Sequence, residues 1–95
     1  MEERYMKKTI ITVVGKDTVG IIANICTYLA QNNVNILDIS QTIIQEYFNM
    51  MMIVDMQKSE KGFDVLAEEL EQVGANMGVI VKLQREEIFD KMHRI

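Results

Sequence analysis

Strand and helix patterns follow one another along this chain in an order that few folds accommodate. Strand patterns cover residues 8–14, 34–44, 47–56 and 77–84, and helical spacing of apolar residues covers 21–31 and 63–73. Two helices of this length can cover only one face of a four-stranded sheet. The sequence therefore predicts an α+β fold of the ferredoxin-like type, βαββαβ, in which an antiparallel four-stranded sheet and two helices form a two-layer sandwich. A length of 95 residues predicts a single domain over 1–95.

The strand segments themselves indicate where they lie in the sheet. Lys8–Val14 is rich in β-branched residues and apolar on both faces at several positions, as in a strand with neighbours on both sides. We therefore expect this strand at the centre of the sheet. A tight turn at residues 45–46 would place Ile43 opposite Phe48 and join the next two strands in a hairpin.

The two helices are marked by apolar stripes and by residues typical of helix ends. The stripes comprise Ile21, Ile22, Ile25, Cys26 and Leu29 in the first helix, and Phe63, Leu66, Ala67, Leu70 and Val73 in the second. Asparagine tolerates the left-handed conformation, so Asn32-Asn33 is expected to end the first helix. Ser59 or Asp64 is expected to cap the start of the second helix, and Gly74 its end.

Two apolar surfaces remain without a partner in this arrangement. Residues 1–7 are expected to form an N-terminal tail, and 86–95 a short C-terminal helix with Ile88, Phe89, Met92 and Ile95 as its apolar side chains. The face of the hairpin that the helices leave uncovered would carry Ile36, Ile44, Tyr47, Met51 and Ile53. Such surfaces are normally buried, so we expect them to meet within or between subunits. The chain is therefore expected to form a homodimer or larger assembly, joined at sheet edges or at open sheet faces.

Charge and composition exclude several classes of partner. A net charge of -4 and a pI near 4.9 argue against a nucleic-acid surface, which needs a basic face. No apolar run approaches the roughly 20 residues that span a bilayer, so no membrane partner is expected. The N-terminus has mixed charge and lacks the apolar core of a signal peptide, which predicts a cytoplasmic protein.

Motifs typical of enzymes are incomplete in this sequence. Gly15–Gly20 resembles a phosphate-binding loop, but isoleucines stand where that motif needs lysine and serine or threonine. Asp17 could pair with Asp38 or Asp55 for acid–base chemistry, yet nothing in the sequence brings these carboxylates together. We therefore predict that the protein is not an enzyme.

Metal and cofactor sites are not predicted either. His93 is the only histidine and has no cysteine or second histidine at metal-ligand spacing. The side chains of Met50, Met51 and Met52 alternate across a strand and cannot converge on one ion. Cys26, the only cysteine, lies on the apolar stripe of the first helix and is expected to be a small buried thiol.

The loop Gly15-Lys16-Asp17-Thr18-Val19-Gly20 joins the first strand to the first helix. Its glycines give the backbone freedom to reach positive φ, and the helix that follows leaves unpaired N–H groups pointing back into the loop. Such a loop can bind a carboxylate or another anion. The alternative is that the glycines serve only a tight connection.

The run from Gly15 to Ile36 resembles the ACT domain. The ACT pattern has an acidic or amide residue, a variable pair, a glycine that opens the first helix and an asparagine early in the second strand. Asp17, Gly20 and Asn35 occupy those places. The full length also resembles short stand-alone ACT proteins, through the segments 39–42, 46–48 and 88–95. A related tandem-ACT protein represses glycine cleavage genes, so the resemblance implies a regulatory role.

The same resemblance implies a ligand site between two subunits, at the first loop of one and the second strand of the other. Its residues would be Gly15, Asp17, Val19, Gly20, Ile21 and Asn35. Backbone N–H groups around Val19–Ile21 would hold the carboxylate of an amino acid or similar metabolite, and Asp17 and Asn35 would meet its ammonium group or side chain. Many family members have proline at the place of Val19, and its absence leaves the loop less rigid.

A second function is compatible with the same fold. The protein would then be a structural or adaptor protein that binds no small ligand. It would dock to a partner enzyme or transcription regulator instead.

Overall fold

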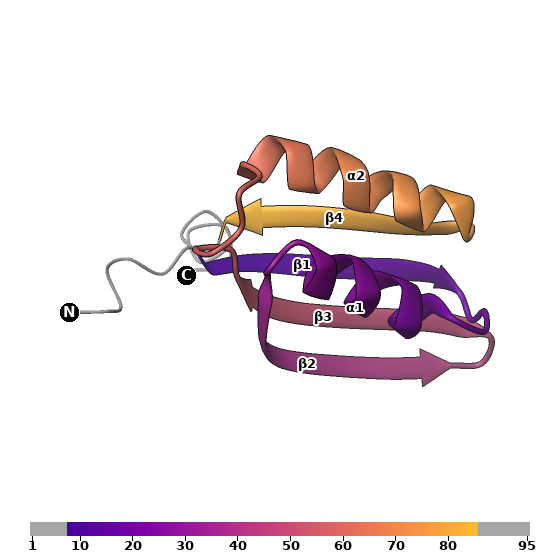
Figure 1. The fold of residues 1–95 in the computed structure, drawn as a ribbon. Helices are drawn as coiled ribbons and strands as arrows, with labels where there is room; N and C mark the ends of the chain where they lie inside the picture. The colour runs from indigo at the N-terminus through magenta and orange to yellow at the C-terminus, as the bar shows by residue number, and fades with distance from the viewer. Residues whose placement is uncertain (1–7, 86–95) are drawn as a thin grey trace.

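The computed structural model describes residues 8–85 and has the predicted order of elements. These are β1 (Lys8–Lys16), α1 (Ile21–Gln31), β2 (Asn35–Ile44), β3 (Tyr47–Asp55), α2 (Phe63–Asn76) and β4 (Val79–Arg85). The strands form one antiparallel sheet in the order β2-β3-β1-β4, with both helices on the same face (Figure 1). The ferredoxin-like prediction is therefore confirmed. The predicted tail over 1–7 and the predicted C-terminal helix over 86–95 lie outside the described residues.

The hydrophobic core lies between the sheet and the two helices. Every second residue from Thr9 to Val13 in β1 and from Phe48 to Val54 in β3 faces the helices and is buried, because side chains alternate across a strand. The fully buried side chains of this layer include Ile11, Val13, Ile25, Leu29, Met50, Met52, Leu66 and Leu70. Cys26 packs against this core but is only partly buried, contrary to the expectation of a buried thiol.

The hairpin between β2 and β3 has the predicted register. Ile43 pairs with Phe48, and Gln45 in the turn has a φ of 58°. β1 lies between β3 and β4, as predicted for a central strand. It extends two residues further than expected and ends at Lys16.

A β-bulge in β2 corrects the prediction for Ile36. The register shifts between Ile36 and Asp38, where Leu37 is the extra residue. Ile36 therefore pairs with Val54 and packs against the core, on the helix side of the sheet. A regular alternation from Ile44 backwards would have placed it on the uncovered face, which is why the prediction was wrong.

The predicted end of α2 is also wrong. Gly74 lies inside the helix, where a Cβ atom would come within 2.4 Å of Val81 Cγ2, so glycine allows α2 to approach β4. The positive φ that follows the helix is taken by Gly78 instead. At the other end, Gly62 precedes the helix without a side-chain cap, and Ser59 Oγ accepts a hydrogen bond from the backbone N–H of Lys61.

Candidate functional site

The loop between β1 and α1 is held against the β2–β3 turn. The backbone N–H of Asp17 donates to the carbonyl of Glu46 at 2.8 Å. The Thr18 hydroxyl donates to the carbonyl of Lys16 at 3.3 Å. These bonds fix the position of the loop relative to the end of the sheet.

Gly20 opens α1 in a conformation that suits glycine. Its φ is 94°, and no side chain caps the helix N-terminus. Within residues 8–85, the backbone N–H groups of Val19, Gly20, Ile22 and Ala23 donate to no backbone acceptor, and that of Ile21 makes only a long bond of 3.4 Å to Thr18. Free N–H groups at a helix start carry partial positive charge, so this loop can receive an anion.

Gly15, predicted as part of the turn, is the penultimate residue of β1. A Cβ atom there would lie 2.8 Å from Val79 Cγ1 on the neighbouring strand β4. Glycine is therefore needed at this position so that the two strands can approach each other. Val19, in contrast, is 98% exposed at the tip of the loop.

Asn35 lies at the other end of the sheet from the loop. It pairs with Asp55, which also pairs with Lys8 at the start of β1, whereas the loop follows Lys16 at the end of β1. Nine strand residues span about 27 Å. The loop after β1 and the start of β2 thus lie at opposite ends of the sheet (Figure 1). A single chain therefore does not bring Asn35 together with Asp17, Val19, Gly20 and Ile21.

A groove of about 530 Å³ surrounds Asn35. It is lined by Asn33 and Val34 from the connection between α1 and β2, Asn35 at the start of β2, Asp55 at the end of β3, and Lys58 from the connector that follows β3. Asn33 takes the left-handed conformation with a φ of 59°, as expected at the end of α1. The carboxylate of Asp55 accepts the backbone N–H of Gln57 at 3.0 Å, which orients it at the end of β3. Val34 is buried and forms the apolar part of the groove.

The lining of this groove is suited to a small molecule that carries both charges. Lys58 can hold a carboxylate, Asp55 an ammonium group, and the amides of Asn33 and Asn35 can donate or accept hydrogen bonds. Sequence reasoning missed Asn33, Asp55 and Lys58 as site residues. Asp55 could have been inferred from the predicted hairpin, because an antiparallel hairpin places the end of β3 beside the start of β2.

The carboxylates considered for acid–base chemistry do not form a site. Asp17 follows β1, whereas Asp55 lies at the far end of the sheet, and Asp38 lies between them on β2 and accepts the backbone N–H of Ile39. Residues 8–85 contain no group of three or more His, Cys, Asp and Glu side chains that could hold a metal ion. No helix within this range is long and apolar enough to cross a membrane.

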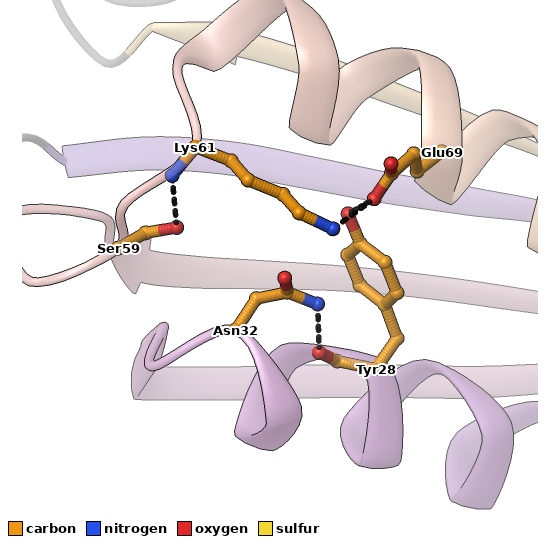
Figure 2. Close-up of polar contacts among 5 residues, drawn as sticks. All are labelled: Tyr28, Asn32, Ser59, Lys61 and Glu69. Carbon is orange, nitrogen blue, oxygen red and sulfur yellow. Dashed lines mark hydrogen bonds and ion pairs between the residues drawn. The ribbon is translucent and has the colours of Figure 1, made fainter.

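A polar cluster on the helix layer joins three elements (Figure 2). The Tyr28 hydroxyl of α1 donates to Glu69 Oε1 of α2 at 2.6 Å, and Lys61 Nζ reaches the same oxygen at 2.8 Å. Burial and the bond to Glu69 raise the pKa of Tyr28. The hydrogen bonds from Lys61 and Tyr28 lower the pKa of Glu69. All three polar groups satisfy one another, so this cluster stabilises the packing of the helices rather than forming a reactive site.

Comparison with known proteins gives a consistent result. The family model of the ACT domain matches residues 7–84. A UPF0237 protein from Bifidobacterium longum is 64% identical over 90 residues, which cover 95% of this chain and 100% of the relative.

Solved structures agree with this match. An ACT domain protein from Streptococcus pneumoniae has a TM-score of 0.77 at 42% identity, covering 88% of this chain and 94% of its own. A protein proposed to be a glycine cleavage system transcriptional repressor has a TM-score of 0.74 at 22% identity, over 84% of this chain and 46% of its own, which shows a similar fold only.

Proposed function

The chain belongs to the ACT domain family, and from that premise we propose that it is a regulatory module that binds an amino acid or a similar small metabolite between two subunits. ACT domains are commonly regulatory modules of this kind, and they act without catalysing a reaction themselves. The proposed ligand carries a carboxylate and an ammonium group. The proposed assembly is a homodimer.

The observation that carries the proposal is the groove beside Asn35. It combines the Lys58 ammonium group, the Asp55 carboxylate and two amides with one apolar residue, Val34. Ligand sites combine an apolar surface with a few polar groups that orient the ligand. An α-amino acid presents both charges on adjacent atoms, so this set of side chains complements it better than it complements a simple anion.

The separation of the loop from Asn35 supports a site built by two chains. Each end of the sheet offers a different half, N–H donors beside Gly20 at one end and polar side chains around Asn35 at the other. A partner that turns its loop toward Asn35 would complete the set. In that arrangement the N–H groups of Val19, Gly20 and Ile21 would bind the carboxylate together with Lys58. The ammonium group would lie between Asp17 of the partner and the groove residues Asn35 and Asp55.

A thermal-shift screen of the purified protein against the twenty amino acids and related metabolites tests the proposal. A ligand at about 100 times its Kd adds about 2.7 kcal/mol to the free energy of unfolding, which raises Tm by about 10–20 °C in a domain of this size. Lys58→Ala and Asn35→Ala should remove that shift. Lys82→Ala and Asn49→Ala, which change exposed residues of the same types away from the groove, should keep it.

The oligomeric state is measured in parallel by sedimentation. A stable monomer at micromolar concentration, with or without the ligand, would contradict the two-subunit site. Absence of any shift at millimolar concentrations would contradict ligand binding, and the adaptor function would then be the one to examine.

A further inference from the structure

Two side-chain amides of the groove beside Asn35 make no hydrogen bond within residues 8–85. They belong to Asn33 and Asn35, which are exposed on either side of the buried Val34. The neighbouring Asn32, in contrast, donates from its side-chain amide to the carbonyl of Tyr28 at 2.9 Å, at the end of α1 (Figure 2). The amides of Asn33 and Asn35 are therefore available to a ligand, and each can both donate and accept hydrogen bonds.

The charged side chains that line the groove are balanced. They are one ammonium group, on Lys58, and one carboxylate, on Asp55. An amino acid bound there engages both through its own α-carboxylate and α-ammonium groups. In the arrangement proposed above the partner's Asp17 also faces the α-ammonium group, so no charge of the groove remains for the side chain of the ligand. A charged side chain would leave water without a partner, which costs binding free energy.

The groove also offers little apolar surface. Val34, its one apolar residue, is only 5% exposed. A leucine or valine ligand gains affinity by removing its apolar side chain from water, and in this groove that side chain would find few apolar partners. It would instead cover the amides of Asn33 and Asn35 and take away their hydrogen bonds to water.

We propose, on the basis of the ligand site proposed above, that the groove selects an amino acid with an uncharged side chain that forms hydrogen bonds, a hydroxyl or a carboxamide. Asn35 already contacts the ammonium group in that arrangement, which leaves the amide of Asn33 to recognise the side chain of the ligand. An amide donates and accepts at once, so it complements either a hydroxyl or a second amide. Serine, threonine, asparagine and glutamine carry such side chains.

Asn33 has a backbone role besides the proposed recognition, and the two can be separated. Its φ is 59°, a conformation that asparagine tolerates better than most residues and that glycine adopts without strain. Asn33→Gly therefore removes the amide and keeps the backbone conformation. Gln45 has a φ of 58° and follows the other end of β2, away from the groove, so Gln45→Gly is a matched control.

The test compares amino acids of similar shape that differ in hydrogen bonding. Threonine is measured against valine, and asparagine against leucine, by isothermal titration calorimetry on the full-length protein. In each pair the polar amino acid should bind about tenfold more tightly, because the apolar one loses a hydrogen bond and leaves an amide without a partner. Glutamate and lysine should bind more weakly than glutamine. Asn33→Gly should bring both affinity ratios close to 1, and Gln45→Gly should leave them unchanged.

Four results would overturn the proposed selectivity. Valine or leucine could bind as tightly as its polar counterpart, or glutamate or lysine more tightly than glutamine; both results would leave an amino-acid site in place without this preference. Unchanged affinity ratios in the Asn33→Gly variant would show that Asn33 has only its backbone role. Absence of binding by all twenty amino acids at millimolar concentrations would contradict the ligand-binding function itself, and the selectivity with it.

Discussion

Tyr28 and Glu69 face each other across the two helices, with the phenol hydroxyl 2.6 Å from the carboxylate oxygen. Lys61 shares that oxygen and lies with its Nζ 5.9 Å from the centre of the Tyr28 ring. These contacts connect α1, α2 and the segment that precedes α2. They add polar contacts between the helices to the apolar packing of the helices on the sheet.

The stability of the fold should depend on pH through this pair. The pKa of Glu69 is lowered from its usual 4.5, so its stabilising effect is present above that value and is lost as the pH falls through the lowered pKa. The pKa of Tyr28 is raised from 10.0, so its effect is complete below pH 10 and is lost as the pH rises toward the raised pKa. Urea unfolding measured across both ranges should show stability decreasing at each end.

Tyr28→Phe should lower Tm moderately at neutral pH and remove most of the alkaline dependence. It should also remove the tyrosinate absorbance that appears at the highest pH in a titration, because the pKa of Tyr28 is raised. Tyr47→Phe is the control, because Tyr47 lies exposed on the other side of the sheet. Equal effects of the two substitutions would contradict the role assigned to Tyr28.

Gly74→Ala should destabilise the protein by about 1–3 kcal/mol, because the added methyl group would overlap the side chain of Val81. Gly62→Ala is a matched control, since in the described chain no atom lies within 4 Å of its added Cβ and its φ is -77°. That variant should change the free energy of unfolding little. Urea denaturation measures both values.

Gly20→Ala should cost about 1–2 kcal/mol, because alanine is strained at a φ of 94°. Gly78→Ala should cost a similar amount at a φ of 79°. The two variants should differ in ligand response, since only Gly20 belongs to the proposed anion-binding loop. A screen in which both variants keep the full thermal shift would argue against that loop.

Cys26 should react slowly with thiol reagents while the protein is folded. Burial raises the pKa of its thiol above 9.0, so less of the reactive thiolate is present at pH 8. Ellman's reagent should therefore modify Cys26 several-fold more slowly in buffer than in denaturing urea. Equal rates would mean that α1 does not shield Cys26 from the reagent in solution.

The sequence predicted the fold well because its strongest patterns agree with one another. The apolar run of β1 indicates a central strand, and pairing Ile43 with Phe48 places four apolar residues of β3 on one face. The β-bulge at Leu37 was missed because one extra residue leaves no periodic signal. Gly74 was assigned to a helix end because the close approach of Val81 depends on tertiary packing.

The candidate site was less accessible to prediction for a physical reason. Asp17 and Asn35 lie at opposite ends of one sheet, so no pattern along a single chain can show how they would meet. The groove residue Lys58 lies in a polar connector whose composition resembles that of any surface loop. Only the antiparallel pairing of β2 with β3 brings Asn35 beside Asp55.

The central position of β1 also determines how the chain must be assembled during synthesis. β1 is made first, but it pairs with β3 and with β4, and Thr9 finds its partner only at Arg85. At about 5–20 residues per second, this strand waits on the order of 4–15 s before its second neighbour exists. Both edges of this run of isoleucine and valine are open until β3 is made, and the edge that pairs with β4 stays open until the end of this interval. Productive folding in the cell therefore depends on keeping the nascent first strand away from other unfinished chains.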